Sequence, residues 1–191
     1  LDEIINDITE KTPACFEPSI DYVVTKVPRW DFEKFRDVED ILGIQMKSVG
    51  EAMSFGRTFK ESFQKALRST EKGRFGFGFD SDIYLTNSIS EQQLIDLKNR
   101  LKIHTSVSIY DVCDALRFGI SISEIHTLAG YDSWFLHQCK EIVDAALSLI
   151  VDNCTLQDID VSHLRYLKEI GFSGHHLGIA IDIAAYTLGA K

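Results

Sequence analysis

The sequence predicts a mainly α-helical fold that follows a small mixed α/β segment. In the later part of the chain, helical periods follow one another with short connections and without strand-like alternation. Earlier, residues 20–30 and 46–55 have the β-branched, aromatic and alternating content of strands. The charge balance also changes, with 12 Lys and Arg against 14 Asp and Glu over residues 1–75, and 8 against 15 over residues 76–191. We therefore expect two parts, 1–75 and 76–191.

The first part opens with a segment that resembles the end of a helix, because its three isoleucines recur at helical spacing within the first eight residues. The chain starts with Leu1 and not with Met, so we expect a piece excised from a longer protein. A strand follows over residues 20–30, and Pro28 favours a place at the sheet edge. Asp31 is the expected cap of a short helix over residues 32–36.

The stretch MKSVGEAMSFGR, residues 46–57, alternates larger side chains with Ser, Gly and Ala. As a strand, it places Lys47 and Glu51 on one face and the small residues on the other. A face of small residues lets another backbone or a ligand approach closely. Lys47 and Glu51 are either a surface ion pair or a polar wall that faces a ligand. Thr58 then begins a helix, and Glu61 completes the pattern of a capping box.

The second part is expected to be a small helical domain. Ser90 and Asp132 are predicted N-caps, and Gly119 and Gly130 are predicted helix ends. The predicted helices lie within residues 90–101, 108–119, 122–130, 133–150, 160–172 and 173–188.

No catalytic residue and no metal ligand is predicted. The four cysteines form no CxxC pair, and Cys113 and Cys139 lie among apolar helix positions, where a free Cys is usually a core residue. The histidines at 163, 175 and 176 are expected to be surface or capping residues, because neighbouring histidines on one helix point apart and no HExxH pattern is present. The glycines of GRFGFGFDSD lack the GK[ST] ending of a phosphate loop and predict a turn.

Composition also excludes several classes of partner. The net charge is −9, which disfavours general binding to nucleic acid. No apolar run is long enough to span a bilayer, and no signal peptide is visible, so we expect no membrane partner. The low number of cysteines favours a reduced intracellular compartment, and we expect a cytoplasmic protein.

The run Trp134-Phe135-Leu136 is a dense apolar patch near the start of a predicted helix. One interpretation places it in the core of the helical domain. The other makes it a contact with another chain, since aromatic residues are enriched at interface centres. The pattern alone does not choose between them.

Several stretches resemble the large subunit of carbamoyl phosphate synthetase. NDITEKTPACFEPSIDYVVTKVPRWDFEKF and MKSVGEAMSFGRTFKESFQKALRS are similar to the end of its first ATP-grasp half, the carboxyphosphate domain. ALRFGISISEIHTLAGYDSWFLHQCKEIV and HLRYLKEIGFSGHHLGIAI resemble its oligomerisation domain. Gly174 departs from the family pattern, which usually has Asp there. The resemblance thus implies ATP-grasp residues over 1–75 and an oligomerisation domain over 76–191.

The resemblance also implies a function for the parent chain. It is an ATP-dependent ligase that makes carbamoyl phosphate from bicarbonate, glutamine-derived ammonia and two ATP, for arginine or pyrimidine biosynthesis. It implies ATP, Mg²⁺ (or Mn²⁺) and K⁺ as cofactors of the full chain, and none in this segment. The implied partners are a glutaminase small subunit and other large subunits. This segment would link the two ATP-grasp halves and, lacking the ATP-gripping residues, have no activity alone.

By the same resemblance, two groups of residues receive roles. Glu51, Met46 and Lys47 are expected to line the tunnel that carries carbamate. Leu116, Arg117, Trp134 and Phe135 are expected to contact other large subunits. The alternative is a stand-alone helical protein-interaction module, which the severed helix at the start and an edge strand without its sheet both disfavour.

Overall fold

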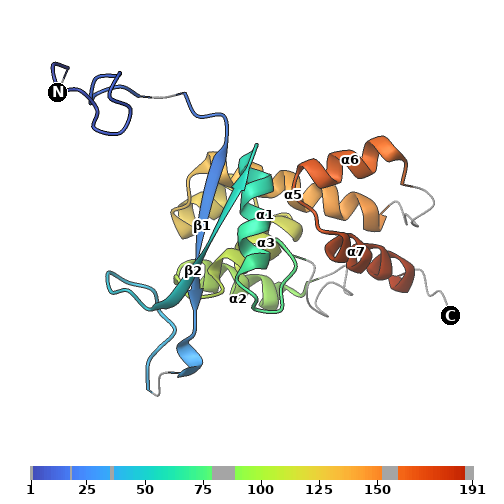
Figure 1. Cartoon of the computed structure of the whole chain (residues 1–191). Coiled ribbons are helices and arrows are strands. Elements are labelled where there is room, and N and C mark those ends of the chain that lie inside the picture. The colour runs from blue at the N-terminus through green and yellow to red at the C-terminus, as the bar shows by residue number, and fades with distance from the viewer. Residues whose placement is uncertain (1, 18, 35–36, 79–88, 152–158, 188–191) are drawn as a thin grey trace.

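The computed structural model describes residues 2–17, 19–34, 37–78, 89–151 and 159–187. Its elements are β1 (Val23–Trp30), the 3₁₀ helix η1 (Phe32–Lys34), β2 (Ser48–Gly56), α1 (Phe59–Ser69), α2 (Glu91–Leu101), α3 (Ser108–Arg117), α4 (Ile122–Ala129), α5 (Ser133–Val151), α6 (Val161–Glu169) and α7 (Gly174–Thr187). The fold is mainly helical, with one two-stranded sheet at its side (Figure 1). The predicted fold class is therefore confirmed.

The sheet is an antiparallel pair of β1 and β2 in which Val27 lies opposite Ala52. Along β2, Ala52, Ser54 and Gly56 are buried, whereas the alternate residues between them are exposed. The predicted division of this strand into a small face and a larger, outer face is therefore confirmed. The strand begins at Ser48, so Met46 and Lys47 precede it.

Helix α1 packs against the small face of the sheet, between the sheet and the other helices (Figure 1). The hydroxyls of Thr25 on β1 and Ser62 on α1 are hydrogen-bonded at 2.7 Å. A Cβ atom added to Gly56 would lie 2.6 Å from the backbone nitrogen of Ser62, much closer than a real contact allows. The small face therefore admits the backbone of a helix.

The hydrophobic core runs from α1 into the helical domain. Phe63 and Leu67 of α1 belong to the same buried cluster as Leu116 of α3 and Leu136 and Ile142 of α5. This core is continuous across residue 75, where the change in charge predicts a division.

The N-terminal segment corrects one prediction, because residues 2–10 are not helical. The side-chain oxygen of Asn6 accepts hydrogen bonds from the amides of Ile8 and Thr9, and Ile5 forms a bridge with Pro13. Ile8 is 93% exposed, so it packs against no helical neighbour. The isoleucines have helical spacing, but they pack against no other described element, and a short helix is not stable without such packing. Local turn hydrogen bonds therefore determine the backbone conformation here.

Most predicted helix caps are observed. Thr58 accepts a hydrogen bond from the Glu61 amide at 3.2 Å, and Ser90 forms a complete capping box with Gln93. Asp132 accepts from the Trp134 amide at 2.8 Å. The Glu61 carboxylate accepts from the amide of Arg57, one residue before the position that a capping box requires.

Some predictions fall outside the described residues. These include the state of Cys154, the end of the short helix predicted over residues 32–36 and the last part of GRFGFGFDSD. Within the described residues, no helix combines the length and the hydropathy that a membrane span requires.

Candidate functional site

The three predicted tunnel residues do not gather at one place. The Glu51 carboxylate lies on the outer face of the sheet and pairs with the Lys26 ammonium at 2.7 Å. The Lys47 ammonium instead donates to the carbonyl of Ile41 at 2.7 Å, so the proposed pair with Glu51 is not formed. Met46 is 89% exposed.

Glu51 does line a pocket of about 440 Å³ beside the sheet. Arg29 and Lys34 share this pocket with Glu51, together with the end of α1 at Ser69 and Thr70. Met46 and Lys47 are not among its lining residues. The pocket therefore places two cations near the Glu51 carboxylate.

A second candidate site is the aromatic patch, which we define as Phe59, Trp134 and Phe135. The Phe59 ring lies 5.7 Å from that of Trp134 and 5.1 Å from that of Phe135, and the latter two are 5.0 Å apart. Trp134 is 53% exposed and Phe135 is 47% exposed. Phe59 also stacks at 5.1 Å on Phe63, which is buried. The patch is thus an outward extension of the core.

Two adjoining helix starts position the aromatic patch. Thr58 caps α1 directly before Phe59, and Asp132 caps α5 two residues before Trp134. An ion pair between Lys60 and Glu141 ties the two helices together. Exposed rings on rigid, capped helix starts are a typical surface for contact with another protein.

Each of the two interpretations of the run Trp134-Phe135-Leu136 therefore applies to part of it. Leu136 is buried in the core, whereas Trp134 and Phe135 belong to the aromatic patch. Leu116 is only 1% exposed, so as the chain is folded here it is a core residue and presents no surface contact. Arg117 is half-buried at the end of α3, with its guanidinium 5.2 Å from the centre of the Phe118 ring.

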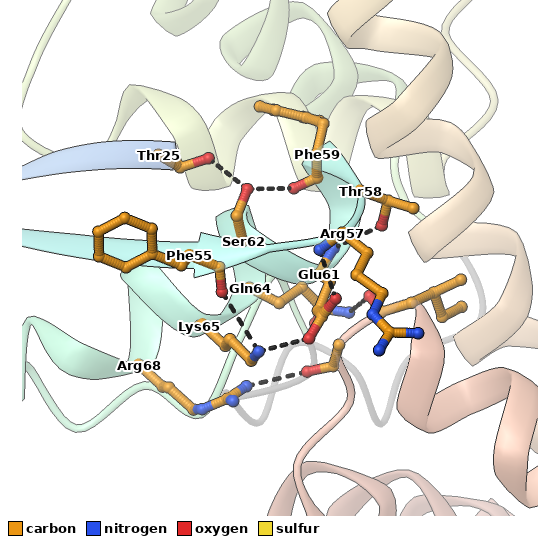
Figure 2. A network of polar contacts seen from close by, with 12 residues as sticks. Thr25, Phe55, Arg57, Thr58, Phe59, Glu61, Ser62, Gln64, Lys65 and Arg68 are labelled. Atoms are coloured by element: carbon orange, nitrogen blue, oxygen red, sulfur yellow. Dashed lines mark hydrogen bonds and ion pairs between the residues drawn. The ribbon is translucent and has the colours of Figure 1, made fainter. Parts of the chain in front are cut away.

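A polar joint that sequence reasoning missed connects α1 to the turn between α6 and α7 (Figure 2). The Gln64 amide donates to the carbonyl of Ile170 at 2.8 Å, and the Arg68 guanidinium donates to that of Gly171 at 2.9 Å. Gly171 has a φ of +99°, and a Cβ there would lie 3.0 Å from the Glu61 Cα. These partners lie about a hundred residues apart, so no local pattern signals them.

His176 corrects the prediction that the three C-terminal histidines are surface or capping residues. Its side chain is fully buried, and its Nε2–H donates to the carbonyl of Gly78 at 2.9 Å. Burial lowers the pKa of His176 to about 4. His175, in contrast, is exposed.

The prediction that Cys113 and Cys139 are core residues is confirmed. Burial raises the pKa of the Cys139 thiol to about 12, which makes it a poor nucleophile. Within the described residues, no three His, Cys, Asp or Glu side chains gather in a way that holds a metal ion.

Comparison with known proteins gives the family. The family described as "Carbamoyl-phosphate synthetase large chain, oligomerisation domain" matches residues 51–188. Relatives named carbamoyl phosphate synthase large chain include one from Synechocystis sp., 47% identical over 180 residues, and one from Archaeoglobus fulgidus, 41% identical over 184. A relative from Arabidopsis thaliana, named carbamoyl phosphate synthase arginine-specific large chain, chloroplastic, is 47% identical over 180 residues.

These alignments cover 94% or 95% of this chain but only 15% or 16% of each relative. The chain therefore spans a small part of the length of the proteins that it matches. Both the extent of the family match and the identities to these relatives lead to one conclusion: this chain belongs to the carbamoyl phosphate synthetase large-chain family and contains its oligomerisation domain.

Proposed function

We propose that this chain acts as part of a carbamoyl phosphate synthetase large chain and contributes assembly, not phosphoryl transfer. The observation that carries this proposal is an identity of 41% to 47% to such chains over nearly all of the sequence. In this proposal the parent chain joins bicarbonate and glutamine-derived ammonia at the expense of two ATP. ATP, Mg²⁺ (or Mn²⁺) and K⁺ serve other parts of the parent chain, a glutaminase subunit supplies ammonia, and the cytoplasm is the site of action.

The assembly role is assigned to the aromatic patch. Trp134 and Phe135 expose large apolar rings, and aromatic side chains are enriched at the centres of protein interfaces. Their backing by Phe59 and the buried Phe63 limits the entropy that they lose on binding. We assign the patch a contact with a second large chain.

The tunnel role remains assigned to Glu51, with Met46 and Lys47 beside it. A carboxylate that already faces Lys26, in a pocket shared with Arg29 and Lys34, lies in a strongly charged environment. Such an environment is suited to steering a small anion, because nearby cations attract it and a carboxylate limits its residence.

The role of linking the two halves is assigned to α1. This helix packs on the sheet through Ser62 and on the helical domain through Phe63, Gln64 and Leu67. Because α1 is packed on both sides, it fixes the position of the sheet relative to the helical domain.

The proposal is tested on the parent large chain. We expect the wild-type chain to associate, and we expect Trp134→Ala with Phe135→Ala to raise the dissociation constant by roughly tenfold or more, as for central aromatic anchors. Sedimentation velocity over a range of concentrations measures this constant. Tyr166→Ala is the matched control, because Tyr166 is an exposed aromatic residue on α6, outside the patch. An unchanged constant in the double variant, or an equal change in the control, contradicts the assembly role.

Activity is measured in the same samples. The parent chain, with the glutaminase subunit, is expected to form carbamoyl phosphate from bicarbonate, glutamine and ATP. The 191-residue chain alone is expected to show no bicarbonate-dependent ATP hydrolysis. A parent chain that folds but forms no carbamoyl phosphate contradicts the proposed reaction independently of the assembly result.

A further inference from the structure

A cleft lies where the sheet, the end of α1 and the start of α3 meet. Its volume is about 330 Å³. Its walls come from residues 27–30 of β1, from Leu67 and Thr70 at the end of α1, and from Ser106, Val107, Ile109 and Tyr110 around the start of α3. We call it the basic cleft.

The charges that line the basic cleft are mainly positive. Arg29, Lys72 and Arg74 line it, against the single carboxylate of Asp40. Asp40 is already engaged, because its carboxylate accepts hydrogen bonds from the backbone amide, at 2.8 Å, and the hydroxyl of Ser106. A positive cleft is notable in a chain whose net charge is −9.

Two of these cations are available to a ligand. Arg29 makes no ion pair within the part of the chain that the structure describes. The Lys72 ammonium is 3.4 Å from the Asp31 carboxylate, which lies closer, at 2.6 Å, to Lys34. Asp31 therefore keeps a partner if Lys72 turns toward an anion in the cleft.

The remaining walls are aromatic and apolar. Trp30, Phe32 and Tyr110 line the cleft, and the Arg74 guanidinium lies 3.9 Å from the centre of the Tyr110 ring. This cation–π contact places the Arg74 guanidinium against the aromatic wall. The buried Leu67 adds an apolar surface. Helix α1 ends beside these cations, and the negative end of its dipole stabilises them. This effect explains the positive charges at the cleft but not its aromatic walls.

We propose that the basic cleft binds a small aromatic anion, that is, a single ring that carries a phosphate or a carboxylate. The ring packs against Trp30 and the apolar surface, and the anionic group pairs with Arg29 and Lys72 beside Arg74. A guanidinium presents paired donors that match both anionic groups. The volume lies at the lower end of the range for small-molecule sites. This site is separate from the aromatic patch, and it shares Arg29 and Thr70 with the pocket that contains Glu51.

The test uses the fluorescence of Trp30. The chain has two tryptophans, so Trp134→Phe leaves Trp30 as the only one. Phenyl phosphate and benzoate are titrated separately to distinguish the two anionic groups, with inorganic phosphate as the probe without a ring. We expect saturable quenching by at least one aromatic probe, with a dissociation constant on the order of 1 mM or below, and weaker binding as salt is added.

The variants Arg29→Ala and Lys72→Ala are expected to weaken the binding of that probe by roughly tenfold each, because each removes a charged partner. Arg165→Ala is the matched control, since Arg165 is exposed on α6, and it is expected to change binding by less than about twofold. Far-UV circular dichroism verifies that each variant is folded. Calorimetry on the chain without Trp134→Phe repeats the titration in case that substitution perturbs the fold.

Three results overturn the proposal. The first is no saturable signal for either aromatic probe up to about 10 mM by fluorescence and calorimetry. The second is an equal loss of affinity in Arg165→Ala, which indicates general attraction to charge. The third is calorimetric binding of inorganic phosphate as tight as that of phenyl phosphate, since the aromatic walls then contribute nothing.

Discussion

At the scale of single residues, His176 shows how burial fixes a protonation state. Its ring packs 4.8 Å from the Phe172 ring and donates to the Gly78 carbonyl. Charging the ring would place a cation in an apolar environment, so its pKa falls from 6.5 to about 4. The folded state therefore holds a neutral imidazole, while the unfolded chain protonates it below pH 6.5.

This difference predicts a loss of stability at mildly acidic pH. The folded pKa lies below the unfolded one, so the contribution of His176 is complete above about pH 6.5 and is lost progressively toward pH 4. We expect the free energy of unfolding to fall by about 2 kcal/mol between about pH 7.5 and 5 from this residue alone. Urea unfolding at the two pH values measures the change.

His176→Gln is expected to show less of this pH dependence, whereas His137→Gln, at an exposed position, is expected to keep all of it. Parallel dependences in wild type and His176→Gln would mean that other groups cause the acid sensitivity.

At the scale of elements, α1 is the helix on which both parts of the fold depend. One side carries Ser62 toward the sheet, and another carries Gln64 and Arg68 toward the turn before α7. Gln64 is fully buried, although a polar side chain at a helix surface is usually exposed. Its amide satisfies the carbonyl at the end of α6, which the helix itself leaves without a partner.

Gln64→Ala is therefore expected to destabilise the chain by about 1–3 kcal/mol, because it leaves the buried carbonyl of Ile170 unsatisfied and opens a cavity. Gln92→Ala on α2 is the control, since Gln92 is exposed and its side-chain amide donates to the exposed Asp96, and a change within about 0.5 kcal/mol is expected. Thermal and urea unfolding monitored by circular dichroism give both values. Equal effects of the two substitutions would contradict a structural role for the joint.

The local patterns of these elements were readable in the sequence, but their distant partners were not. Alternation in β2 and the caps at Thr58, Ser90 and Asp132 depend on neighbours within a few residues, and the structure confirms them. The burial of His176 depends on a contact with Gly78 that no spacing reveals. The isoleucines at 4, 5 and 8 show the opposite case, in which a local pattern predicts an element that does not form. Their spacing is helical, but they have no surface to pack against among the described residues, and no helix is present there.

The candidate site follows the same rule. The exposed pair Trp134 and Phe135 was visible as an aromatic run, yet its backing by Phe59 depends on two helices meeting. The charge pattern suggested a pair between Lys47 and Glu51, but Lys47 lies before β2 and donates to the carbonyl of Ile41. The Glu51 carboxylate pairs instead with Lys26 of β1, its diagonal neighbour across the sheet, a contact that depends on the register of the two strands.

At the scale of the whole molecule, the described residues cover the sheet on one face only. Its outer face exposes Val24, Met53 and Phe55, and Tyr22 packs on Phe55 with the ring centres 5.8 Å apart. A two-stranded sheet is marginally stable without further packing. The relatives are several times longer than this chain, and we infer that other parts of such a protein cover this face.

The 191-residue chain on its own is therefore expected to associate through the outer face as well as through the aromatic patch. Met53→Lys with Phe55→Lys is expected to reduce binding of a hydrophobic dye and to shift light scattering toward the monomer, while the fold is kept because both side chains are exposed. Ile95→Lys, at an exposed position on α2, is the control for added charge.

Under this inference the outer face of the sheet is covered in the parent chain. Comparing the short chain with the parent chain should therefore distinguish association through the outer face from association through the aromatic patch. The two sheet substitutions act on the short chain, whereas Trp134→Ala with Phe135→Ala acts on both chains. If Met53→Lys with Phe55→Lys leaves the mass and the dye binding of the short chain unchanged, the outer face of the sheet does not mediate self-association. If Trp134→Ala with Phe135→Ala then abolishes association of the short chain, that association arises from the aromatic patch, and the short chain reports directly on assembly of the parent.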